Sequence, residues 1–193
     1  MKIQVRSFLM LAAIAGSVSV ISCKEVEKEE ATPMQNEMHQ EDEKVQKADD
    51  LALNDEITAE FKEESTEAIY QSYINIKQAL VETDATMAQD RAKEMLANLE
   101  NSETNAELAT AVRNISTSTD VNEQRKAFSE LTKQIESKLQ GAIESGEIYK
   151  QFCPMAFEGK GDYWFSNSKE IRNPYFGDKM LKCGRVEATI SGS

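Results

Sequence analysis

The chain has 193 residues, of which 22 are lysine or arginine and 34 are aspartate or glutamate, so its formal net charge is −12. An acidic chain of this kind repels phosphate backbones and anionic lipid surfaces, which argues against a nucleic-acid partner and against charge-driven membrane binding. The sequence has no Gly-rich phosphate loop, and its one histidine, His39, cannot complete a Ser/His/Asp or Cys/His arrangement, so we expect neither an organic cofactor nor an enzyme.

Residues 1–22 have the pattern of a lipoprotein signal peptide. Lys2 and Arg6 give a positive start, and the apolar run that follows is short for a membrane span but typical of a secretion signal. The string Val20-Ile21-Ser22-Cys23 resembles the bacterial lipobox. This resemblance implies that Cys23 is diacylated, becomes the mature N-terminus and anchors the protein to a membrane. The alternative is an ordinary signal peptide in which Cys23 is incidental.

Residues 23–54 are predicted to form a disordered acidic tether, because a charged segment with few apolar residues cannot bury enough surface to fold. Met34, Met38 and His39 lie within it, and we interpret them as a chance grouping rather than a metal-binding tract. The expected location is the bacterial cell envelope, with the lipid anchor in the outer membrane on its periplasmic or surface face.

Residues 55 to about 145 predict a mainly α fold, an antiparallel up-down four-helix bundle. Apolar residues recur at intervals of three and four from Ile57 to Ala142. Asp84 can cap the second helix, and Asp120 with Glu123 resembles a capping box for the fourth. The predicted core includes five large apolar side chains, namely Phe61, Leu80, Leu96, Phe128 and Leu131.

The pattern changes after Gly141 and Gly146. Eight of the thirteen aromatic residues lie between Tyr149 and Phe176. Short strands are predicted at 148–152, 163–165 and 186–190, separated by turn residues. We therefore expect a small loop-rich, partly β cap that packs on the bundle, so that residues 55–193 form one folded unit.

Two sulfur-containing strings frame this cap: Cys153-Pro-Met155 and Met180-Leu-Lys-Cys183. Thiolate and thioether sulfur are soft ligands that favour Cu(I), so convergence of the strings would make a metal site. Convergence of the cysteines alone would allow a disulfide that closes about 30 residues and stabilises the fold by roughly 3–4 kcal/mol. Both interpretations remain open from the residues. The neighbouring aromatic side chains are interpreted first as the core of the cap.

Several strings in the second half of the chain resemble domain-of-unknown-function family 3347 over roughly residues 60–190. They are Gln124-Arg125, Cys153-Pro154-Met155-Ala156, Trp164-Phe165-Ser166, Asn173-Pro174-Tyr175-Phe176-Gly177 and Cys183-Gly184. The resemblance implies an exported lipoprotein domain, or one attached to the adaptor subunits of heavy-metal efflux pumps. It also implies heavy-metal handling, foremost of copper.

The expected function is therefore binding of a soft heavy-metal ion, foremost Cu(I), for sequestration or for transfer to an efflux adaptor or another envelope protein. The expected ligands are Cys153, Met155, Met180 and Cys183. The alternative is a non-catalytic protein–protein interaction module, in which Cys153 and Cys183 form only a structural disulfide. Contact with the membrane is expected through the lipid anchor at Cys23 alone.

Overall fold

A computed structural model of the chain describes the fold of residues 57–99 and 106–192. The predicted signal peptide (residues 1–22), Cys23 and the predicted tether (residues 23–54) lie outside the described residues and stay predictions. Within the described ranges the protein is mainly helical, with small antiparallel sheets toward its C-terminal end, as the sequence predicts. No helix in these ranges combines the length and the apolarity that crossing a membrane requires.

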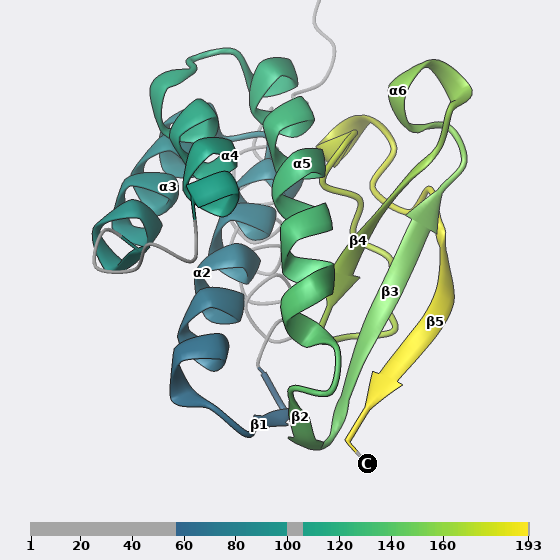
Figure 1. The fold of residues 1–193 in the computed structure, drawn as a ribbon. Helices are drawn as coiled ribbons and strands as arrows, with labels where there is room; N and C mark the ends of the chain where they lie inside the picture. The colour runs from purple at the N-terminus through teal and green to yellow at the C-terminus, as the bar shows by residue number, and fades with distance from the viewer. Residues whose placement is uncertain (1–56, 100–105, 193) are drawn as a thin grey trace, which may run out of the picture.

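Four helices make up the first part of the fold: α2 (Glu64–Val81), α3 (Ala85–Leu99), α4 (Ala106–Thr117) and α5 (Val121–Leu139). Each packs against the next along the chain, and α2 also packs against α5 (Figure 1). Of the five predicted core residues, Leu96 is only half-buried, whereas the other four are buried. The apolar stripes read from the sequence therefore do face a common core.

The start of the first helix differs from the prediction. The apolar spacing places Ile57 and Phe61 on that helix, but β1 (Glu60–Phe61) pairs antiparallel with β2 (Ile143–Ser145), and α2 begins only at Glu64. Gly146 follows β2 with a φ of +82°, and a Cβ there would stand 2.7 Å from the Ala59 Cα. The close pairing of these two distant segments thus overrides the local helical pattern.

Both predicted helix caps form hydrogen bonds with the backbone. The Asp84 carboxylate accepts from the Met87 N–H at 2.8 Å, and the Asp120 carboxylate accepts from the Asn122 N–H at 2.8 Å. The Glu123 carboxylate pairs with a lysine one turn further along α5 at 2.8 Å. These caps satisfy N–H groups that have no partner within the helix, which explains why α3 and α5 begin where they do.

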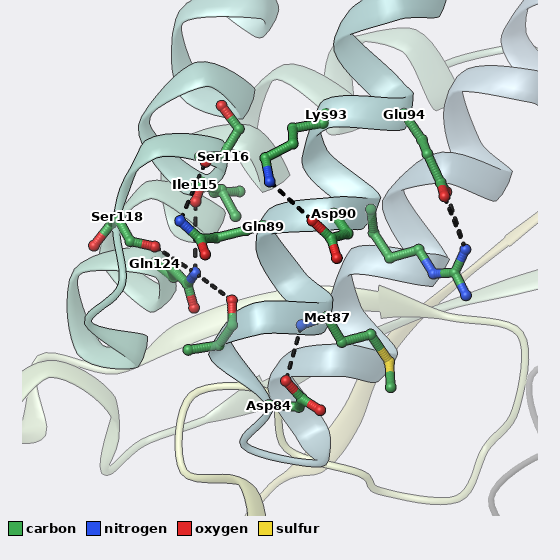
Figure 2. A network of polar contacts seen from close by, with 12 residues as sticks. Asp84, Met87, Gln89, Asp90, Lys93, Glu94, Ile115, Ser116, Ser118 and Gln124 are labelled. Atoms are coloured by element: carbon green, nitrogen blue, oxygen red, sulfur yellow. Dashed lines mark hydrogen bonds and ion pairs between the residues drawn. The ribbon is translucent and has the colours of Figure 1, made fainter.

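A buried glutamine ties three helix ends together. The Gln124 side-chain N–H₂ donates to the backbone carbonyls of Ala85 and Ser118, each at 2.8 Å (Figure 2). Ala85 begins α3, Ser118 follows the end of α4, and Gln124 itself lies in the first turn and a half of α5. One amide thereby supplies a donor to the Ser118 carbonyl, which α4 leaves open, and a further donor to the Ala85 carbonyl in the first turn of α3, so it links the three helices.

A three-stranded antiparallel sheet forms most of the predicted cap. Its central strand β3 (Glu147–Cys153) pairs with β4 (Asp162–Ser166) on one side and with β5 (Arg185–Ser191) on the other. All three predicted strands are therefore confirmed. The sheet stands beside α5, with β4 packed against that helix and β5 at the outer edge (Figure 1). The short helices α6 (Ala156–Gly159) and η2 (Gly177–Lys179) lie in its connections.

Buried aromatic rings join this sheet to the helices. Tyr73 of α2 stacks on Phe128 of α5 with ring centroids 4.9 Å apart. Tyr175 lies edge-on to both Phe128 and Trp164, at 6.1 and 6.0 Å. All four side chains are buried, so the rings interpreted as the core of the cap belong to the one core that the cap shares with the helices.

Replacing Phe128 tests this shared core. Phe128→Ala should lower the free energy of unfolding by about 3–5 kcal/mol, because a fully buried ring is replaced by a cavity. Chemical denaturation measures the loss. Lys133→Ala on the same helix is the matched control, and its exposed ion pair with Glu130 should be worth less than about 1 kcal/mol. Equal effects of the two substitutions would contradict the packing described here.

Candidate functional site

The two cysteines of the cap meet at one end of the sheet. Cys153 is the last residue of β3, and Cys183 lies two residues before β5. Because β3 and β5 pair antiparallel with Phe152 opposite Arg185, the end of one strand returns to the start of the other. The two sulfur atoms are 3.0 Å apart. The structure thus brings together the two thiols that the sequence singles out.

The two thiols differ in their surroundings. Cys153 is fully buried, whereas Cys183 is half-buried, and both are free thiols in this structure. The adjacent Cys153 thiol is the main reason that the pKa of Cys183 is raised, and burial adds to the effect. The backbone N–H of Met155 hydrogen-bonds to Cys183 and acts in the opposite direction, lowering its pKa.

The two methionines lie at the surface next to this pair. Met155 is 54% exposed and Met180 is 37% exposed, so neither side chain fills a gap in the core. Met155 reaches Cys183 through its backbone N–H, and the Met180 carbonyl accepts from the Cys183 N–H at 3.0 Å. Met155, Met180 and the nearby Val186 are the exposed large hydrophobic residues of the described part of the chain. We call these three residues the apolar rim.

The segment that carries Cys183 is held by Asn173, the first residue of the Asn173-Pro174-Tyr175-Phe176-Gly177 string. We call residues 167–184, which connect β4 to β5, the strap. The Asn173 side-chain amide donates to the Cys183 carbonyl at 2.7 Å, and its oxygen accepts from the N–H groups of Tyr175 at 2.8 Å and Phe176 at 3.2 Å. The Asn-Pro-aromatic string is the signal for this role, since asparagine often bonds its own backbone two residues on.

A second buried amide anchors the start of the strap to the sheet. Gln151 on β3 donates through its side chain to the carbonyls of Ser168 at 2.7 Å and Glu170 at 3.1 Å. Gln151 lies two residues before Cys153 and opposite Trp164 on β4. Gln151 therefore fixes the start of the strap to the sheet, whereas Asn173, itself a strap residue, holds the backbone of the strap together near Cys183.

Gly184 allows the strap to pass close to the sheet beside the thiol pair. Its φ is +149°, and a Cβ at this position would stand 3.0 Å from both the Phe152 carbonyl oxygen and Trp164 Cη2. A side chain at residue 184 would therefore push against the strand that ends in Cys153. The single tryptophan of the chain thus lies next to the thiol pair, which makes it an optical reporter of changes there.

The side chains at this site determine which metal ions it could bind. Across residues 57–99 and 106–192, no group of three or more histidine, cysteine, aspartate or glutamate side chains could hold a metal ion. The two thiols supply only two of the four cysteine, histidine or carboxylate ligands of a typical zinc site, and thioethers are not among those ligands. The thiols and thioethers do match the preference of a soft cation such as Cu(I) for thiolate and thioether sulfur, and the two thiols also permit a disulfide.

Asn173 provides a test of how the site is held. Asn173→Ala should lower the free energy of unfolding by about 2–4 kcal/mol, because it leaves the Cys183 carbonyl and the Tyr175 and Phe176 N–H groups without their partner. Thermal or chemical denaturation under reducing conditions measures it. Asn114→Ala, at an exposed position of α4, is the control and should change stability little. A cost below about 1 kcal/mol for Asn173→Ala would show that the strap does not depend on this side chain.

Comparison with known proteins bears on the helical part of the chain. No curated protein and no solved structure matches it. The family model described as "Protein of unknown function (DUF3347)" matches residues 69–145, from the first turns of α2 to the end of β2. The match ends before Cys153, so the thiol pair lies outside it. The matched residues 69–145 are therefore similar to the DUF3347 family, the family that the sequence resemblance indicates.

Proposed function

We propose that this protein binds a soft heavy-metal ion, foremost Cu(I), for sequestration or for transfer to efflux components. The observation that supports the proposal is the contact between the Cys153 and Cys183 sulfurs, 3.0 Å apart, with the exposed Met155 and Met180 both joined to Cys183 through their backbones. Two thiols hold the ion, and one or both thioethers complete its coordination from the surface. Soft sulfur donors favour Cu(I) over harder cations such as Mg²⁺ or Ca²⁺.

The charge near Cys183 suits such an ion. Two thiolates and one monovalent cation leave a net negative charge at the site. Lys179, Lys182 and Arg185 are exposed on the same short segment, which contains no acidic residue between Lys179 and Arg185. Lys182 and Arg185 pair with Glu170 and Glu187, so part of their charge is already compensated, and the segment offsets only part of the charge of a dithiolate complex.

The exposure of the methionines supports transfer rather than permanent storage. A thioether at the surface can bind an ion that arrives from solvent or from another protein and can release it again without any opening of the core. The buried thiol of Cys153 supplies a ligand that solvent does not reach. A site with one protected end and one open end is therefore suited to accepting an ion and passing it on.

The cell-envelope location and the finer architecture belong to the same proposal. We infer that Cys23 carries the lipid anchor, that the acidic tether spaces the folded domain from the membrane, and that α2 to α5 form an antiparallel up-down bundle. The packing of each helix on the next, and of α2 on α5, supports the bundle. The lipobox string and the family resemblance support export, with an efflux adaptor or another envelope protein as the partner.

A second candidate function follows from the same sulfur contact. A gap of 3.0 Å is only about 1 Å longer than a disulfide bond, so the pair can equally form a staple that holds the strap to the sheet. In that case the protein is a non-catalytic interaction module whose helical bundle docks an envelope partner, and Cys153 and Cys183 only staple the cap. The methionines separate the two candidates, because a disulfide requires no thioether.

Competition with a Cu(I) chelator under reducing conditions tests the proposal. The reduced wild type should withdraw Cu(I), and Met155→Leu with Met180→Leu should weaken binding by roughly tenfold or more, about 1.4 kcal/mol per factor of ten. Leucine conserves volume but offers no lone pair. The matched control is Met87→Leu with Met95→Leu on α3, away from the site. Failure of the wild type to compete, or equal competition by all three proteins, would favour the interaction module.

The lipid anchor has its own test. In a bacterial host, Cys23→Ala should abolish incorporation of radiolabelled palmitate and release the protein from the membrane fraction, because no other residue of the lipobox string carries a thiol. Cys153→Ala with Cys183→Ala is the control and should keep the label. Label retained in Cys23→Ala would refute acylation at this position.

A further inference from the structure

The two thiols of the pair are unequal, and the difference has a chemical consequence. Cys153 is fully buried at the end of β3, whereas Cys183 is half-buried on the strap, between the exposed residues Lys182 and Arg185. We propose that Cys153 and Cys183 form a reversible redox couple with a fixed order of reaction. Cys183 exchanges first with an incoming disulfide, and Cys153 then completes an internal disulfide.

Access determines the order. An incoming disulfide must bring one sulfur into contact with the attacking thiolate, and solvent reaches Cys183 but not Cys153. Residues of the apolar rim lie next to Cys183, so a partner can approach this side without displacing the sheet. Cys153 itself is fully buried, and the Phe152 carbonyl and Trp164 occupy the space that a side chain at Gly184 would need.

Proximity determines the second step. The Cys153 sulfur already lies 3.0 Å from the Cys183 sulfur, and bond formation requires an approach of about 1 Å. Cys153 is held by the pairing of β3 with Asp162 on β4, and Cys183 is held by Asn173 and by the Met180 carbonyl. Two reacting groups already held in contact react far faster than the same groups free in solution. A mixed disulfide at Cys183 should therefore be short-lived in the wild type.

The exchange proceeds in two steps, each of which forms one sulfur–sulfur bond and breaks another. The Cys183 thiolate attacks one sulfur of the incoming disulfide R–S–S–R, which forms Cys183–S–S–R and releases RS⁻. The Cys153 thiolate then attacks the Cys183 sulfur, which forms the internal disulfide and releases the second RS⁻. The two protein thiols lose two electrons, the incoming disulfide gains them, and the two protons pass through solvent to the released thiolates. An excess of RSH reverses both steps.

This chemistry regulates the metal site, and that part of the inference rests on the proposed function. A disulfide has no thiolate to donate to a soft cation, so oxidation should release a bound ion, and reduction should restore binding. Conversely, an ion held by both thiols should shield them from exchange. The site would then bind metal only under reducing conditions, without any large movement of the strap.

The test uses the full chain with Cys23→Ser, so that Cys153 and Cys183 are the only thiols, and oxidised glutathione as the disulfide. Intact mass at timed intervals should show Cys153→Ala accumulating a stable glutathione adduct on Cys183. Cys183→Ala should form its adduct at least about tenfold more slowly, because its thiol is buried. The mass of the chain with both thiols should fall by two hydrogen atoms without accumulation of an adduct. Excess reduced glutathione should reverse this change.

A labelling experiment needs no substitution at the pair. Brief treatment of the reduced chain with iodoacetamide, followed by peptide mapping, should place the first label on Cys183. Equal labelling of both cysteines, or equal rates of glutathione adduct formation in the two variants, would overturn the order of reaction. An internal disulfide that excess reduced glutathione cannot open in the folded chain would overturn reversibility.

A final measurement separates this inference from the proposed function. Exchange with oxidised glutathione is repeated with one equivalent of Ag(I), a redox-stable mimic of Cu(I), and Trp164 fluorescence is recorded alongside the mass. Slower exchange with Ag(I) supports the proposed regulation. Exchange that is reversible and unaffected by Ag(I) keeps the redox couple and refutes metal binding at the pair. Binding of Ag(I) without any exchange in its absence refutes the redox couple and leaves the proposed function intact.

Discussion

The fold depends on the buried contact between Tyr73 of α2 and Phe128 of α5, because this pair supports both the helices and the sheet. The stacked rings join the first and last of the four helices, and Phe128 also contacts Tyr175 of the strap. The Tyr73 hydroxyl accepts from the Phe165 N–H on β4 at 3.0 Å and lies 3.1 Å from the Thr132 hydroxyl. Burial raises the pKa of Tyr73, so the hydroxyl stays protonated, and its buried polar group is satisfied.

This shared core explains how a short, loop-rich segment can hold two thiols in contact. The strap has little regular structure, and a segment of that kind would not keep its shape alone. It is fixed instead at separate points: Gln151 holds its start, Tyr175 enters the aromatic core, and Asn173 holds the backbone of Cys183. Another anchor comes from α5, where the buried Arg125 donates to the Pro174 carbonyl at 2.8 Å. The helices therefore position the site although they contribute none of its sulfur atoms.

The parts of this structure that follow a simple period could be predicted from the sequence. Stripes spaced by threes and fours locate α3, α4 and α5, and the caps at Asp84 and Asp120 fix two helix starts, because both signals act within a few residues. The β1–β2 pairing joins segments more than 80 residues apart, and no local pattern at Phe61 indicates it. The same holds for Asn173, whose string predicts a turn but not its bond to Cys183.

The candidate site could be predicted only in part, for a related reason. Cysteine is rare in this chain, so the spacing of Cys153 and Cys183 draws attention to them, and the antiparallel return of β5 beside β3 is what brings them together. The sequence does not reveal that one thiol is buried and the other accessible, since the burial of each depends on contacts with segments far away along the chain. This difference arises from the strap, which leaves Cys183 near the surface and packs Gly184 against Trp164 over the end of β3.

Charged side chains around Cys183 contribute less to the position of the site than the buried contacts do. The chain as a whole is acidic, yet the segment around Cys183 presents Lys179, Lys182 and Arg185. Two of these are already paired, Lys182 with Glu170 and Arg185 with Glu187, and exposed pairs of this kind are weak and exchange readily. Glu170 also pairs with the buried Arg172, so these charges are compensated within the strap and along β5. The thiol pair therefore depends for its position on the buried contacts of Asn173 and Tyr175 rather than on the surface charges around Cys183.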